Sequence, residues 1–269
     1  MLYAAPRMYD LLFAEREDDV RWYTAVAGPA TEVLELGVGT GRIALPLAEL
    51  GHHVVGVDNA PAMLDSLGAR RDKASAAVRS RLELHLADAT TLRLGRRFGR
   101  VFFPFNGIAH CMTLESLEAL FATVRAHLAP GGIFAFDVWI PEPSILSETP
   151  LESGRFVHPQ RREPCTMREA FRYDPIAQVL HTTVSVCPVA GGGPREDFTL
   201  SQKMFYPAET RLLLGRVGFD LLWCTPRWRA PDPTAAGPDD PCPSDALGSM
   251  LAYVCAPSPS VQRAVGTAG

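Results

Sequence analysis

The sequence lacks several features that would point to particular classes of protein. No run of lysines and arginines is long enough to follow a phosphate backbone, and the net charge is only −4, so no nucleic-acid partner is expected. No stretch is long and apolar enough to span a bilayer, and residues 1–19 lack the basic flank and apolar centre of a secretory signal. We therefore expect no membrane association.

Cysteine is scarce and widely spaced. None of the six cysteines forms a Cys-x-x-Cys pair with another, a pattern typical of reduced thiols, most of them small core residues. The sequence therefore predicts a cytoplasmic protein without a metal site.

Short apolar runs alternate with helical patterns along most of the chain, which has 269 residues and is 47% hydrophobic. Such alternation is typical of a parallel sheet with helices on both faces. It predicts a Rossmann-like α/β fold with a seven-stranded, mostly parallel sheet. The expected strands are residues 32–37, 53–58, 82–88, 101–106, 132–139, 218–225 and 250–256, and the expected helices are 5–27, 42–50, 61–71, 114–128 and 209–217.

The alternation of apolar runs and helical patterns stops after residue 139. Three segments have the pattern of extended strands and are separated by turn signals, namely residues 166–173, 178–189 and 197–206. This pattern predicts a small antiparallel β insertion. We therefore expect five parts. They are an N-terminal helical lid (1–30), a cofactor-binding α/β core (31–140), an inserted substrate cap (141–207), the completion of the core sheet (208–257) and a flexible tail (258–269).

Three glycines, Gly37, Gly39 and Gly41, fall within five positions where the first strand turns into a helix. Bare backbone there lets N–H groups approach a ligand beside a helix N-terminus. A tight turn without a ligand is the alternative. The dinucleotide fingerprint would place its third glycine at Arg42, one position later than Gly41.

The ordered motifs "LELGVGTGR", "VVGVDNAPAML", "LADATTL" and "LAPGGIFAFDVW" together resemble those of the class I S-adenosylmethionine-dependent methyltransferases. The resemblance covers residues 32–139. Around "FFPFNGIAHC" it extends to the small-molecule N-methyltransferases that act on glycine and amino sugars.

The resemblance implies S-adenosylmethionine as cofactor and assigns residues to it. Glu35, Gly37 and Gly39 would hold the methionyl end, and the carboxylate of Asp58 would accept the ribose hydroxyls. Asp58 could instead cap a helix, and Asp88 could be a solvated loop residue. The remaining cofactor contacts expected are Gly41, Asn59, Met63, Asp88, Ala89 and Phe105, with Asp88 and Ala89 on the adenine.

Substrate residues are expected where the fourth strand ends. The resemblance implies that Asn106 orients the substrate, and His110 is the candidate base because a histidine accepts a proton near neutral pH. His110 could equally pack or cap the next helix. Tyr9 and Tyr23 from the lid and Trp139 at a strand end are further substrate candidates, with Trp139 also readable as core.

Glycine-type enzymes carry an arginine after the fifth strand, whereas this chain reads "DVWIPEP". An aromatic or apolar metabolite is therefore expected, methylated on nitrogen or oxygen, and the Ala-, Arg- and Pro-rich composition suggests bacterial secondary metabolism. An NAD(P)-dependent oxidoreductase and a macromolecule-directed methyltransferase are the alternatives. The sequence leaves the oligomeric state open, with a homodimer as one alternative.

Overall fold

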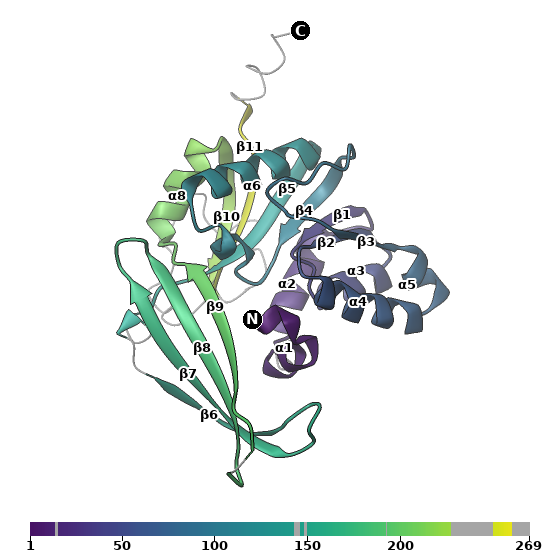
Figure 1. The fold of residues 1–269 in the computed structure, drawn as a ribbon. Helices are drawn as coiled ribbons and strands as arrows, with labels where there is room; N and C mark the ends of the chain where they lie inside the picture. The colour runs from purple at the N-terminus through teal and green to yellow at the C-terminus, as the bar shows by residue number, and fades with distance from the viewer. Residues whose placement is uncertain (14–15, 143–145, 148–149, 192, 227–249, 260–269) are drawn as a thin grey trace.

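The computed structural model describes residues 1–13, 16–142, 146–147, 150–191, 193–226 and 250–259 (Figure 1). The Pro-rich segment near residue 235, the Arg227–Arg229 stretch and most of the expected tail lie outside the described residues.

The central sheet has seven strands in the order β10-β11-β5-β4-β1-β2-β3. Strands β1 to β5 are mutually parallel where they pair, and β11 runs antiparallel to both β5 and β10. The strand order reverses between β1 and β4, which is where open α/β sheets bind their ligands. The strands are β1 (Glu32–Leu36), β2 (His53–Asp58), β3 (Leu82–Leu86), β4 (Phe98–Phe103), β5 (Leu128–Trp139), β10 (Phe219–Pro226) and β11 (Met250–Pro257).

Alternate residues of these strands enter two separate hydrophobic clusters, one on each face of the sheet. Val33 and Phe102 pack with α2, α3 and α4, whereas Leu34 and Val101 pack with α6 and α8. Both faces are therefore covered, as the apolar strands predict. The helices are α1 (Pro6–Leu12), α2 (Asp18–Ala27), α3 (Ala44–Glu49), α4 (Pro61–Lys73), α5 (Ala76–Ser80), α6 (Leu114–His127) and α8 (Pro207–Arg216), with 3₁₀ turns η1 (Leu2–Ala4) and η2 (Gly107–His110).

The insertion forms a four-stranded antiparallel sheet, in the order β6-β7-β8-β9, that projects from one end of the α/β layer (Figure 1). Helix α1 lies between this sheet and the α/β layer. The strands are β6 (Leu151–Val157), β7 (Pro164–Asp174), β8 (Val179–Pro188) and β9 (Glu196–Lys203).

The predicted fold class is confirmed, with differences at particular elements. Strand β6 was not predicted, because "LESGRFV" has no apolar alternation and becomes a strand by pairing with β7. The single N-terminal helix expected over residues 5–27 is two helices, and α2 begins where Asp18 and Asp19 favour a helix N-terminus. Asn106 lies beyond β4 in a loop, not within the strand.

Among the described residues, no helix has the length and hydropathy needed to cross a membrane.

Candidate active site

The three glycines after β1 all have left-handed backbone angles, with φ of 63° at Gly37, 56° at Gly39 and 86° at Gly41. A Cβ on Gly41 would lie 2.2 Å from Leu67 Cδ1, and one on Gly37 would lie 2.9 Å from Phe103 Cε2. For a Cβ added at Gly39, the nearest atom is the Gly37 carbonyl oxygen, at 3.9 Å. Packing therefore uses the space at Gly37 and Gly41, whereas at Gly39 no side chain lies within 4 Å of the added Cβ.

Asp58 closes this loop from the end of β2. Its Oδ2 accepts a hydrogen bond of 2.8 Å from the Gly39 N–H, and its Oδ1 accepts one of 2.8 Å from the Ala60 N–H. Burial raises the pKa of the Asp58 carboxyl, and these N–H groups oppose the increase. The carboxylate both shapes the loop and keeps oxygen lone pairs for a ligand.

The ends of β2 and β3 lie side by side. The Ala87 N–H donates to the Asp58 carbonyl oxygen at 3.0 Å, so Asp88 follows on the same edge of the sheet. Asp88 is exposed, and its Oδ1 accepts hydrogen bonds of 2.7 Å from both the backbone N–H and the hydroxyl of Thr90. The two carboxylates therefore lie at one edge, as the sequence predicts.

Glu35 on β1 is a buried carboxylate without a full set of partners. Only 1% of its surface is exposed, and its Oε2 accepts no hydrogen bond from the described residues. Burial raises the pKa of Glu35 strongly, and the positive charge of Arg42 opposes that increase. An unpartnered buried carboxylate is costly, so a cationic group of a ligand is the partner that would complete it.

The loop after β4 has an unusual backbone. Phe105 and Asn106 have φ angles of 58° and 57°, a conformation that costs a non-glycine residue about 1–2 kcal/mol. The Asp137 carboxylate holds both residues, accepting hydrogen bonds of 2.8 Å from the Phe105 N–H and 2.7 Å from the Asn106 N–H. The Tyr23 hydroxyl donates to the same carboxylate at 2.8 Å.

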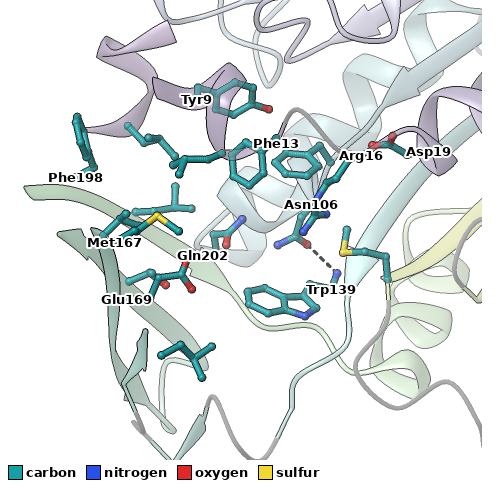
Figure 2. Close-up of a pocket in the computed structure, with 18 of the residues that line it drawn as sticks. Tyr9, Phe13, Arg16, Asp19, Asn106, Trp139, Met167, Glu169, Phe198 and Gln202 are labelled. Carbon is teal, nitrogen blue, oxygen red and sulfur yellow. Dashed lines mark hydrogen bonds between the residues drawn. The ribbon is translucent and has the colours of Figure 1, made fainter. Parts of the chain in front are cut away.

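Asn106 has one satisfied and one free polar atom. Its Oδ1 accepts a hydrogen bond of 3.1 Å from the Trp139 N–H, which fixes the amide plane (Figure 2). Its Nδ2 is buried and has no acceptor among the described residues. Asn106 lines a cavity, described next, and this free donor is available to a ligand there.

The cavity has a volume of about 730 Å³ and lies between α1, the ends of β4 and β5, and the inserted sheet (Figure 2). Its walls are rich in aromatic and aliphatic side chains. A cavity of this size and character suits a small organic molecule. Contributors from the sequence predictions are Tyr9, Phe105, Asn106 and Trp139, and further ones include Tyr3, Phe13, Arg16, Met167, Glu169, Phe171, Phe198 and Gln202.

Comparison with known proteins agrees with this arrangement. A family model described as a methyltransferase domain matches residues 33–132, the stretch that carries the glycine loop, Asp58 and the Asn106 loop. The CcbJ methyltransferase from Streptomyces caelestis has a similar structure, with a TM-score of 0.74 and 28% identity over 91% of this chain and 92% of that one. Residues 33–132 therefore form a methyltransferase domain, and the chain as a whole has the fold of a solved methyltransferase.

Two further proteins that are named as methyltransferases are similar to this chain. A dTDP-3-amino-3,4,6-trideoxy-alpha-D-glucopyranose N,N-dimethyltransferase from Streptomyces venezuelae is 27% identical over 143 residues, which span 49% of this chain and only 56% of that protein. The glycopeptide N-methyltransferase MtfA, complexed with S-adenosylhomocysteine, has a TM-score of 0.60 and 25% identity over 88% of this chain and 85% of that one.

The loop of this methyltransferase fits the cofactor of the class, S-adenosylmethionine, in two respects. The unpartnered Oε2 of Glu35 matches the cofactor's ammonium group, and the backbone of Gly39, unlike that of Gly37 and Gly41, is not covered by a side chain. Of the other residues expected at the cofactor, Met63 of α4 is buried in one cluster with Leu2 of η1 and with Met8 and Tyr9 of α1. Asn59 is exposed and Ala89 is half-buried.

Two expected site residues lie elsewhere. Tyr23 does not line the cavity: it is fully buried, bonded to Asp137 and packed on Trp22 and Phe102. The expectation that it contacts substrate is wrong, because α2 packs into the core. His110 is exposed and does not line the cavity either, and its Nε2 shares a hydrogen bond of 2.8 Å with the Tyr3 hydroxyl.

Sequence reasoning missed Asp137, Glu169 and Arg16. Asp137 had a signal, since it is a lone acid within the apolar run 132–139. Glu169 had a weak signal, since it stands between Met167 and Phe171 on one face of the expected strand 166–173, and Arg16 had none, because most of its neighbours in sequence are charged.

Proposed function

We propose that this methyltransferase transfers a methyl group from S-adenosylmethionine to an amine nitrogen of a small molecule with apolar or aromatic surface. The observation that carries this proposal is the cavity of about 730 Å³ beside the strand-order reversal. It is lined by Phe105 and Asn106 from the loop after β4, the strand that pairs with the Glu35-bearing β1.

The cofactor-binding roles rest on this edge of the sheet. Glu35 would bind the methionyl ammonium, Gly39 would lie against the cofactor, and Asp58 would accept the ribose hydroxyls. Asn59, Met63, Asp88 and Ala89 would surround the adenine, with Phe105 at the cavity side. Gly37 and Gly41 contribute by letting Phe103 and Leu67 pack against the loop.

When bound, S-adenosylmethionine supplies an activated electrophilic methyl group. The chain's own contribution is chiefly positioning, because in-line displacement needs the acceptor held close to that carbon. The free Nδ2 of Asn106 would donate a hydrogen bond to the acceptor molecule, and the aromatic walls formed by Tyr9, Phe13 and Trp139 would exclude water.

His110 keeps a role through Tyr3. Tyr3 lines the cavity, and its hydroxyl shares a hydrogen bond of 2.8 Å with His110 Nε2. A proton released in the cavity could pass through this hydroxyl to the imidazole, which exchanges protons with solvent.

The choice of nitrogen is supported by the relatives. The Streptomyces venezuelae relative is named as a sugar N,N-dimethyltransferase and MtfA as a glycopeptide N-methyltransferase. Amino sugars and amino-bearing natural products are therefore the first candidate substrates. We further propose that η1 and α1 form the lid and that the inserted sheet forms the substrate cap. The five described cysteines are free thiols, which supports a cytoplasmic location.

The test is calorimetric binding of S-adenosylhomocysteine, followed by mass spectrometry with S-adenosylmethionine and a panel of amino sugars and aromatic amines. Asp58→Ala should weaken cofactor-product binding by about tenfold or more, because charge-assisted hydrogen bonds to the ribose are lost. Asp72→Ala, on exposed α4 surface, should bind normally. Failure of the wild-type protein to bind S-adenosylhomocysteine would contradict the proposal.

A further inference from the structure

Building on the proposed function, we infer that Glu169 on β7 binds a positively charged amino group of the methyl acceptor. It thereby selects amines over neutral alcohols of the same shape. Figure 2 shows the Glu169 carboxylate directed into the cavity from the inserted sheet.

Glu169 lies within an apolar surface. Leu151 is its partner on β6 and Val184 is its partner on β8. Met167 and Phe171 precede and follow it by two residues, so they lie on the same face of β7. All four neighbours line the cavity, so the carboxylate is surrounded by hydrocarbon on its own sheet.

Glu169 is also the sole titratable group that the described part of the inserted sheet contributes to the cavity, beside the neutral polar Thr182 and Gln202. No hydrogen bond or ion pair to another described residue satisfies it, and burial raises the pKa of its carboxyl while the charge of Arg16 opposes this. A half-buried carboxylate among apolar side chains costs folding free energy unless a cation or donor meets it.

The other charges around the cavity leave it net negative. At its rim Arg21 pairs with Glu17 at 2.7 Å and Asp18 at 3.9 Å. Asp19 pairs with Arg42.

Among the described residues that line the cavity, three charged ones remain, namely Arg16, Glu142 and Glu169. The guanidinium of Arg16 lies 5.6 Å from the Phe13 ring centre and 5.0 Å from that of Phe105, and its charge offsets part of that of Glu169. Two carboxylates against one cation favour a positively charged ligand.

This arrangement discriminates by charge. An ammonium group would donate to Glu169 while the apolar part of the substrate fills the space beside Met167 and Phe171, and it would release one proton before its nitrogen accepts the methyl group. A hydroxyl analogue would fit the same space but would donate only a neutral hydrogen bond to the carboxylate, so it would bind more weakly than the ammonium.

Fluorine NMR on the protein saturated with S-adenosylhomocysteine tests this without relying on turnover. The two probes are para-fluorobenzylamine, which is cationic at neutral pH, and para-fluorobenzyl alcohol, its neutral isostere. We expect the wild-type protein to bind the amine about tenfold more tightly than the alcohol, as a charge-assisted hydrogen bond predicts. Glu169→Gln should weaken amine binding about tenfold and leave alcohol binding unchanged.

Glu152→Gln is the matched control, because it removes the same charge from an exposed position on β6, and it should retain the preference. Glu169→Asp, which keeps the charge on a shorter side chain, should retain part of it. A preference that survives in Glu169→Gln, or wild-type protein that binds the amine no better than the alcohol, overturns the inference. Either result with S-adenosylhomocysteine still bound leaves the proposed function intact, whereas loss of that binding overturns the proposed function itself.

Discussion

At the scale of single residues, the glycine loop shows one residue type used for two purposes. All three glycines need a left-handed backbone, but Leu67 fills the space at Gly41 while no side chain lies within 4 Å of a Cβ added at Gly39. We therefore propose that the stability of the fold depends chiefly on Gly41 and the binding of a ligand on Gly39.

Alanine at these two positions should separate the effects. Gly41→Ala should lower the free energy of unfolding by about 3 kcal/mol, since it adds a steric conflict with Leu67 to backbone strain. Gly39→Ala should lower the free energy of unfolding by about 1 kcal/mol from backbone strain alone. Relative to this loss of stability, it should weaken S-adenosylhomocysteine binding more than Gly41→Ala does. Urea unfolding and calorimetry measure the two quantities, and equal destabilisation by both variants would contradict this account.

At the scale of elements, α1 is tied to the glycine loop and to α4 through Asp10. Its Oδ1 accepts a hydrogen bond of 2.6 Å from the Thr40 hydroxyl, and its other oxygen pairs with Arg70. Tyr9 on the same helix packs at 4.9 Å, ring centre to ring centre, on Phe13. One carboxylate thus couples the proposed lid to the loop that would hold the cofactor.

Asp10→Asn should loosen α1 without unfolding the protein. Amide hydrogen exchange within α1 should accelerate about fivefold, corresponding to a loss of about 1 kcal/mol of local stability, and S-adenosylhomocysteine should dissociate faster. Asp65→Asn, on the exposed side of α4, is the control and should leave both rates unchanged. Unaltered α1 exchange in Asp10→Asn would show that the helix is held by its apolar contacts alone.

At the scale of the whole molecule, two sheets and the N-terminal segment meet around the cavity. Leu2, Met8 and Tyr9 pack in one cluster with Met63 of α4 and with Val184 and Phe198 of the inserted sheet. The interior of the α/β layer also contains a charged group, Asp137, which is fully buried. The stability of the whole chain should therefore depend on pH through this group.

Burial raises the pKa of Asp137 to about 6, above the value near 4 expected in the unfolded chain. The folded state then binds this proton more tightly, so the stabilisation is complete below about pH 4 and is lost as the pH rises through about 6. The loss should reach about 1.4 kcal/mol per pH unit and about 3 kcal/mol in total.

Asp137→Asn removes the titrating group, so the unfolding free energy of the wild-type protein minus that of the variant should fall between about pH 4 and pH 6 and stay constant above about pH 7. Denaturant titrations across this range measure the difference. Parallel pH profiles for the two proteins would refute the assignment.

The sequence by itself determined the order of strands and helices, the glycine loop and the placing of Asp58 and Asp88 at one sheet edge. These features follow from apolar periodicity, left-handed turn residues and strand ends, which are encoded within a few neighbouring residues. The predicted strand boundaries were less accurate: Asn106 lies outside β4, and β6 is a strand only because β7 pairs with it.

Only the tertiary structure decided which side chains share the cavity. Tyr9 and Tyr23 look alike in sequence, yet one lines the cavity and the other bonds to Asp137 in the core. Glu169 gains its surroundings from Leu151 and Val184 on neighbouring strands. Such contacts join residues far apart in the chain, and packing fixes them through the register and orientation of whole elements, which no local pattern specifies.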